Sequence, residues 1–102
     1  MDIEWIRRQV RSGNYEFSGH ADDERQAERI PIADVEGALL NGEILEDYQN
    51  DPRGPSCLVL GHGSPAYPIH VVCGQTPSRR LRLITVYVPS QPKWVDERTR
   101  RR

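Results

Sequence analysis

The sequence predicts an α+β fold in which N-terminal helices pack on one face of an antiparallel sheet of about four strands. Up to Gly42, apolar side chains recur at helical spacing, and beyond it they gather in short extended blocks separated by turns. The connections between these blocks are short, which favours antiparallel neighbours. The length of 102 residues suits one domain, which we place at residues 1–90, followed by a loose basic tail at residues 91–102.

Three helices are expected before the sheet. The first covers about residues 2–12, because apolar residues there fall at helical spacing. A second follows Ser18, a suitable N-cap, and runs to about Arg29. A third begins near Ile32 and ends at Gly42, a suitable left-handed C′ residue. The buried face of this third helix is expected to be Ile32, Val35, Ala38 and Leu39.

Four strands are expected after the helices, and a brief alternation at residues 15–18 suggests a short edge strand. The four predicted strands are residues 43–48, 56–61, 66–73 and 81–88. Cys57 and Cys73 stand singly inside apolar strands, without a C-x-x-C pairing. We interpret both as small buried side chains in a reducing compartment rather than as a disulfide.

Composition and charge narrow the classes of function. The N-terminus carries charges where a signal peptide would be apolar, and no apolar run approaches a membrane span, so a cytoplasmic protein is expected. The net charge of −1 is unfavourable for binding nucleic acid. However, most carboxylates fall in residues 16–51, and Arg and Lys dominate from Arg79 onward. The three histidines lack acidic or cysteine partners at ligand spacing, so neither a metal nor a cofactor is expected.

The first candidate for chemistry is the predicted second helix. Arg25 and Arg29 are four residues apart, so both would emerge on one helix face and could clamp a phosphate. The alternative is that they pair with nearby carboxylates such as Asp22 and Glu28. His20 lies in the first turn, where the helix dipole disfavours imidazolium, so it is either a neutral base or a structural residue.

The second candidate is a strand pair that holds His70, Thr85 and Tyr87 within apolar runs. Thr85 and Tyr87 share one face because side chains alternate along a strand. An even-length loop, such as Pro77-Ser78, would put His70 on the same face and create a catalytic surface, whereas an odd-length loop would put it on the other face. The alternative role for these residues is structural, on a solvated sheet face.

The basic C-terminal region supplies candidates for substrate binding. We assign Arg82, Lys93 and Trp94 to this role, because arginine and lysine can contact phosphate and tryptophan can stack on a base. The alternative for Trp94 is that it anchors the tail to the sheet.

The chain also resembles a known family, the domain of unknown function family 4258, over about residues 15–94. The resemblance is carried by Ser18-Gly19-His20-Ala21, Arg25, Arg29, Ile32, Asp34-Val35, Ala38-Leu39, Gly42-Glu43-Ile44, Cys57-Leu58-Val59-Leu60-Gly61, His70-Val71-Val72 and Ile84-Thr85-Val86-Tyr87. This family is placed near the bacterial RelE-like and MqsR-like toxins. The resemblance therefore implies a BECR-like fold, with helices packed on a twisted antiparallel sheet that carries an RNA-cleaving site. It also implies a zinc-finger or helix-turn-helix antitoxin as partner.

The function that the resemblance implies is a metal-independent endoribonuclease toxin of the RNA interferase type. The ribose 2′-hydroxyl would attack the adjacent phosphate, with His70 as base or acid and His20 as the second such group. Arg25 and Arg29 would stabilise the phosphorane charge, and Tyr87 would orient the 2′-hydroxyl. The alternative is a non-catalytic protein-binding module of the same fold.

Overall fold

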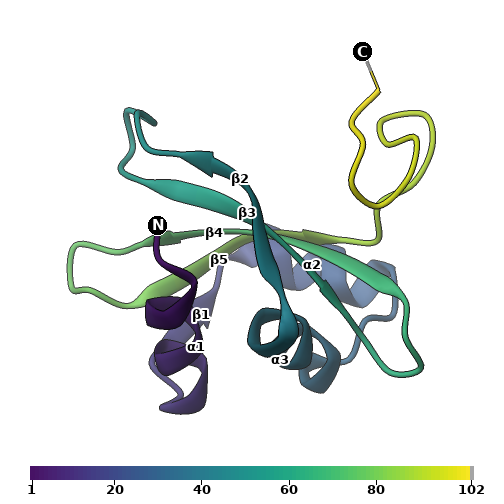
Figure 1. The fold of residues 1–102 in the computed structure, drawn as a ribbon. Helices are drawn as coiled ribbons and strands as arrows, with labels where there is room; N and C mark the ends of the chain where they lie inside the picture. The colour runs from purple at the N-terminus through teal and green to yellow at the C-terminus, as the bar shows by residue number, and fades with distance from the viewer. Residues whose placement is uncertain (102) are drawn as a thin grey trace.

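The computed structural model describes residues 1–101 and contains three helices and one five-stranded sheet (Figure 1). In chain order the elements are α1 (Ile3–Arg11), β1 (Tyr15–Phe17), α2 (Gly19–Ala27), α3 (Ile32–Asn41), β2 (Glu43–Tyr48), β3 (Ser56–His62), β4 (Pro68–Gln75) and β5 (Leu81–Tyr87). Arg102, the last residue of the predicted tail, lies outside the described residues. The predicted α+β class is confirmed. Within residues 1–101, no helix has the length and apolar character needed to cross a bilayer.

The strand order of the sheet is β1-β5-β4-β3-β2. The strands β2 to β5 pair antiparallel in succession, as predicted, but β1 adds a fifth strand that runs parallel to β5. Tyr15 lies opposite Leu81, and Phe17 lies opposite Leu83. The prediction of about four antiparallel strands therefore needs correction. Because β5 ends the run of hairpins, its outer edge has no later strand to pair with, and β1 occupies part of that edge.

The helices α1 and α2 begin close to the predicted positions, because both have side-chain caps. The Asp2 carboxylate accepts a hydrogen bond from the Glu4 amide at 3.0 Å, and Ser18 Oγ accepts from the Ala21 amide at 2.9 Å. However, α2 ends at Ala27, so it stops short of the predicted end.

Gly42 follows α3 with an extended backbone at φ −85°, so the predicted left-handed conformation is wrong. Glycine is needed there for space instead: a Cβ would lie 2.4 Å from the Ala38 carbonyl oxygen. Ile32, predicted to be buried, is 46 % exposed because it lies in the first turn of α3 and points away from the sheet.

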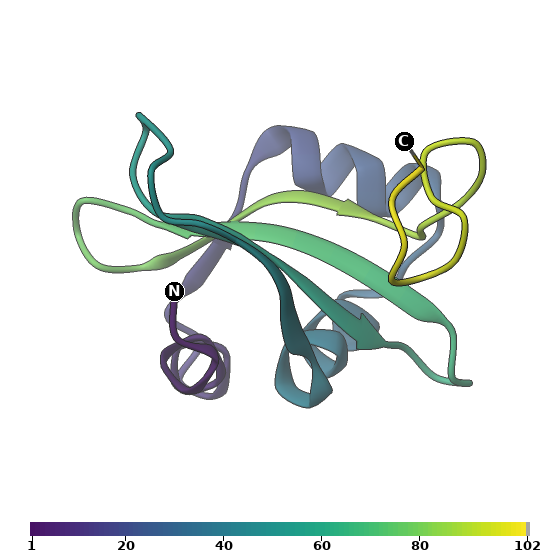
Figure 2. The same cartoon turned by 45° about the horizontal axis from the view of Figure 1, so that its top comes forward.

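The prediction that all helices pack on one face of the sheet is confirmed only for α1 and α3. These two helices lie side by side below the sheet, while α2 lies apart from them, along β5 (Figure 2). The core between α1, α3 and the sheet includes Ile6, Val10, Val35, Ala38, Leu39, Cys57, Val59, Val71, Cys73, Leu83 and Val86. The opposite sheet face is hereafter called the open face.

The helix α2 seals the part of the β5 edge that β1 does not reach. Glu24 accepts a hydrogen bond from the Val86 amide at 3.0 Å, and Glu28 accepts from the Val88 amide at 2.7 Å. Two carboxylates thus take the place of a neighbouring strand, which explains why this polar helix with a single buried residue, Ala21, docks at all.

The hairpin between β4 and β5 combines an odd-length loop with a β-bulge, and together they set the register. Gln75 pairs with Leu81 across the five-residue loop 76–80, which is odd in length. A register shift follows, leaving Ile84 as the extra residue of a β-bulge, and beyond it His70 pairs with Tyr87. Of the two loop parities left open by the sequence, the structure has the odd one, yet His70 and Tyr87 share a face because the bulge restores the parity.

Residues 89–101 fold back onto the sheet and are hereafter called the strap (Figures 1 and 2). Trp94 is only 2 % exposed, and its backbone forms a bridge with Arg100. Trp94 therefore does anchor the C-terminal segment, but that segment is folded rather than loose.

Candidate active site on the open sheet face

Three rows of cross-strand partners run across the open face, from β2 to β5. The first row is Glu43, Leu60, His70 and Tyr87; the second is Glu46, Leu58, Val72 and Thr85; the third is Tyr48, Ser56, Gly74 and Arg82. Bulges in β2 and β5 keep these residues in step on one face. All the predicted strand-borne candidates, His70, Thr85 and Tyr87, thus lie together in two adjacent rows.

His70 is fully buried in the first row, and both of its ring nitrogens have partners. Nε2 lies 2.7 Å from the Glu97 carbonyl oxygen, and Nδ1 lies 3.1 Å from the Tyr87 hydroxyl. A carbonyl oxygen only accepts, so Nε2 carries a proton and donates it. Burial lowers the pKa of His70, which favours the neutral ring, and Nδ1 then accepts from the Tyr87 hydroxyl.

Aromatic rings enclose the imidazole. The Trp94 ring meets it edge to face with centroids 4.4 Å apart, and the Tyr87 ring does so at 5.2 Å. Burial raises the pKa of Tyr87, so its hydroxyl stays protonated and able to donate. The buried indole Nε1 of Trp94 interacts with the Tyr87 hydroxyl, and this contact partly offsets the rise in the pKa of Tyr87.

A charged cluster borders this ring stack. Arg100 donates to Glu46 at 2.7 Å, and its guanidinium lies 4.6 Å from the centre of the Trp94 ring. The Arg100 hydrogen bond lowers the pKa of Glu46. Tyr48 also donates to Glu46, and burial together with that carboxylate raises the pKa of Tyr48 to about 12.

Several residues of this site were not predicted from the sequence, namely Glu46, Tyr48, Glu97 and Arg100. Glu46 and Tyr48 could have been identified from the sequence, because two residues at alternate positions of a strand share a face. Glu97 and Arg100 could not, since their place depends on how the strap folds back.

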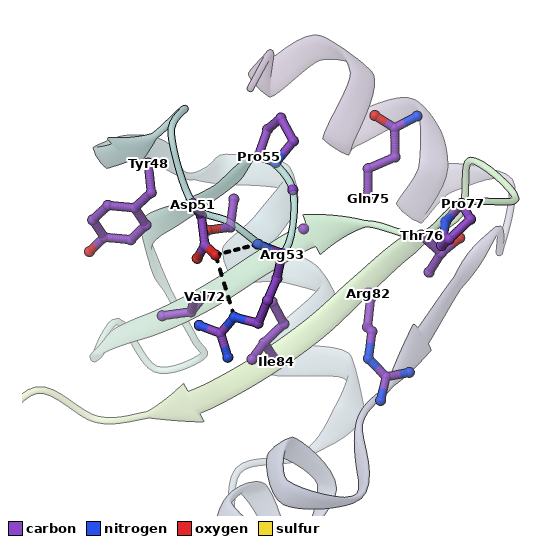
Figure 3. A pocket seen from close by; sticks show the side chains of 13 residues that line it. Tyr48, Asp51, Arg53, Pro55, Val72, Gln75, Thr76, Pro77, Arg82 and Ile84 are labelled. Carbon is purple, nitrogen blue, oxygen red and sulfur yellow. Dashed lines mark hydrogen bonds and ion pairs between the residues drawn. The ribbon is translucent and has the colours of Figure 1, made fainter.

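All four residues of the third row line a groove of about 560 Å³ that continues the open face away from His70 (Figure 3). Val72 and Ile84 form an apolar floor between Tyr48 on one side and Arg82 on the other. Arg53 reaches over the same groove and is held by Asp51. Val72 follows His70 by two residues along β4, so the groove begins about 7 Å from the imidazole.

The predicted substrate-binding residues are spread along this face. Arg82 lines the groove and forms an ion pair with Glu16 of β1. Trp94 packs on His70, and the neighbouring Lys93 is exposed, with its carbonyl accepting from the Arg101 amide.

The helical candidates do not form the predicted phosphate clamp. Because α2 ends at Ala27, Arg29 lies beyond the helix with φ 58°, and it does not share a helix face with Arg25. Arg25 instead pairs with Asp22 at 2.7 Å and donates to the Ile30 carbonyl. This arrangement bears out the alternative in which carboxylates hold Arg25.

His20 is exposed on α2 and lies 3.3 Å from Glu24. Within residues 1–101, no hydrogen bond or ion pair joins His20, Arg25 or Arg29 to His70 or Tyr87. The described part of the chain also contains no group of three or more side chains placed to hold a metal ion.

No curated protein and no solved structure matches the chain. A family model does match residues 17–88, which include α2, α3 and the strands β2 to β5 but not the strap. The match therefore contains His70 and Tyr87 and excludes the segment that covers them. By this match over most of its length, the chain belongs to the family described as Domain of unknown function (DUF4258).

Proposed function

We propose that this chain is a metal-independent endoribonuclease of the toxin type, acting at His70 on the open sheet face. The observation that carries the proposal is the hydrogen-bonded pair of His70 and Tyr87 at the end of an arginine-flanked groove. A neutral imidazole that can gain a proton near neutral pH suits general acid–base catalysis. The resemblance to RelE-like toxins supports an antitoxin as the protein partner.

The proposed reaction is transesterification of RNA. The 2′-oxygen attacks the adjacent phosphorus as its proton passes to a base, and the bond from phosphorus to the 5′-oxygen breaks as that oxygen gains a proton. The products are a 2′,3′-cyclic phosphate and a free 5′-hydroxyl. His70 is the proton-transferring group: once Nε2 is released from the Glu97 carbonyl, the ring takes the tautomer in which Nδ1 donates to the Tyr87 hydroxyl. Nε2 then accepts the 2′-hydroxyl proton and passes it to the 5′-oxygen, while Tyr87 positions the ring.

The groove supplies a place for the substrate next to His70. Its apolar floor of Val72 and Ile84 suits the face of a base, and the Tyr48 ring at its border can stack on a second one. Arg53 and Arg82 suit phosphate, although each now pairs with a carboxylate that RNA would have to replace. These two arginines take the role that the sequence suggested for the helical pair.

The test is RNA cleavage by the full chain in EDTA, with the ends of the products identified. His70→Asn is expected to reduce the rate by roughly 10² to 10⁴-fold. Tyr87→Phe removes only the hydroxyl that holds the ring, and we expect roughly a tenfold loss with a shifted pH profile. The matched control is Tyr15→Phe, which removes a hydroxyl bonded to Glu36 away from the open face and is expected to cleave like the wild type.

Equal cleavage by the wild type and His70→Asn would overturn the proposal, as would the absence of cleavage by any form with an accessible His70. In the second case the alternative, a non-catalytic protein-binding module, would take its place.

A further inference from the structure

We infer that the strap is a displaceable cover which closes the open face over His70, and that a polyanion opens it by drawing Arg98 and Arg100 away from two glutamates of β2. The identity of that polyanion as RNA rests on the proposed function. The cover itself rests only on the contacts of the strap.

The closed form leaves no path to His70. Neither α1 nor α3 lies on the open face, yet Leu58, Leu60 and His70 are buried there. The Glu97 carbonyl oxygen lies 2.7 Å from Nε2 of His70, in the place where a ligand of this ring nitrogen would bind. Any chemistry at this imidazole therefore requires the strap to move.

The strap is folded on itself rather than paired with the sheet. Its backbone bonds run from Trp94 to Ser90, from Val95 to Thr99 and from Arg101 to Lys93, at 2.8–3.0 Å. Within residues 1–101, no backbone–backbone hydrogen bond joins the strap to a strand. It can therefore leave the sheet as a unit without breaking a strand ladder.

Trp94 is the buried side chain of the strap, and the other strap side chains that contact the sheet do so through ion pairs at the border of the open face. Trp94 is buried, whereas ion pairs tie Arg98 to Glu43, Arg100 to Glu46, and His62 to Glu97.

All six of those paired side chains are more than a quarter exposed, so each pair adds little to the closed state. The buried Trp94 ring is therefore the main attachment of the strap to the sheet.

The charge pattern indicates what opens the cover. The strap carries the cations Lys93, Arg98, Arg100 and Arg101, and the two that are held are held by glutamates. A polyanion competes directly with those glutamates for the same guanidinium groups. Because the family match ends at residue 88, this cover lies outside the matched domain.

The test measures access to Trp94 and His70 without measuring cleavage. In a Trp5→Phe background, acrylamide quenching reports Trp94, and carbethoxylation by diethyl pyrocarbonate with mass spectrometry reports His70. We expect slow modification of His70 in the wild type, with the exposed His20 as the fast internal reference.

Two variants should open the strap. Arg98→Gln combined with Arg100→Gln removes the two pairs and retains Trp94, and Trp94→Ala removes the buried ring. Each is expected to accelerate carbethoxylation of His70 by about tenfold or more. The matched control is Arg11→Gln, which removes an exposed arginine of α1 outside the strap and should leave the rate unchanged.

The polyanion is tested with a 2′-deoxy-substituted RNA oligonucleotide, which cannot be cleaved, and with inorganic polyphosphate. Both should increase the quenching of Trp94. Unchanged quenching with both polyanions, or equal His70 reactivity in the wild type and in the folded double variant, would overturn the inference. An open strap without RNA cleavage would refute only the proposed function, and His70-dependent cleavage with Trp94 still protected would refute only the cover.

Discussion

The two faces of the sheet are covered in different ways, and the difference separates a core from a site. On one face, α1 and α3 bury apolar residues such as Val59 and Val71 together with the thiols of Cys57 and Cys73. On the open face, a short strap covers His70 beside a charged cluster. The first cover is a part of the hydrophobic core, whereas the second lies against groups that can do chemistry.

The attachments of the two covers differ as well. The helices contribute large buried side chains, so removing them from the sheet amounts to unfolding. The strap contributes one buried ring and a border of exposed ion pairs. We therefore expect the open face to be reached by local opening, and the helix-covered face only by global unfolding.

The largest expected effect is a contrast in reactivity between the two faces. Cys57 and Cys73 are fully buried thiols with their sulfur atoms 3.8 Å apart, and the hydrogen bond with Cys57 together with burial raises the pKa of Cys73. Their labelling by a thiol reagent should follow global unfolding, and so be slower than local opening at His70 by about three orders of magnitude. Labelling kinetics measured over a denaturant series check this. A thiol rate independent of denaturant would show that the helix-covered face also opens locally.

The next effect compares two glycines, one on each face. A Cβ at Gly61 would lie 1.9 Å from the backbone of Ala38 in α3, whereas at Gly74, on the open face, the nearest atoms are 3.4 Å away. Gly61→Ala should therefore lower the free energy of unfolding by about 3 kcal/mol or more, because α3 must shift. Gly74→Ala is expected to change it by less than about 1 kcal/mol. Urea denaturation measures the free energy of unfolding of both variants. Similar decreases in the two variants would contradict the expected difference between the two faces.

The sequence predicted the helix-covered face better than the open one, for physical reasons. Periodicity reports burial against a regular element, so the buried residues Val35, Ala38 and Leu39 of α3 were correctly identified. The end of α2 was not predicted, because no glycine or proline marks it. Its early stop, and not the spacing of Arg25 and Arg29, decides where those guanidiniums lie.

The hairpin shows why strand alternation alone could not decide whether His70 and Tyr87 share a face. Alternation alone requires an even loop to bring His70 and Tyr87 together, and the loop is odd. The bulge at Ile84 supplies the missing residue, and Ile84 lines the groove, whereas unbroken alternation would place it on the face of Val86. A bulge depends on sheet twist and on neighbouring strands, which no local pattern contains.

The smallest expected effect is a dependence of strap closure on pH. The pKa of His70 in the closed form is lowered, chiefly by burial, so the exposed imidazole binds a proton more readily than the covered one. Closure is therefore complete above the ordinary pKa of about 6.5 and weakens as the pH falls below it. Acrylamide quenching of Trp94 should increase as the pH is lowered from 7.5 to 5.5.

The charged groups that face His70 have opposing effects on its pKa. Glu46 and Glu97 favour its protonation, while Arg100 opposes it, and burial outweighs them. His62 is the other imidazole at the strap, and its Nε2 lies 2.8 Å from the Glu97 carboxylate. His62→Asn should therefore keep the acid-induced increase in quenching, and His70→Asn should lose it. An increase that survives in His70→Asn would assign the pH dependence to the ion pairs at the border of the strap rather than to the imidazole beneath it.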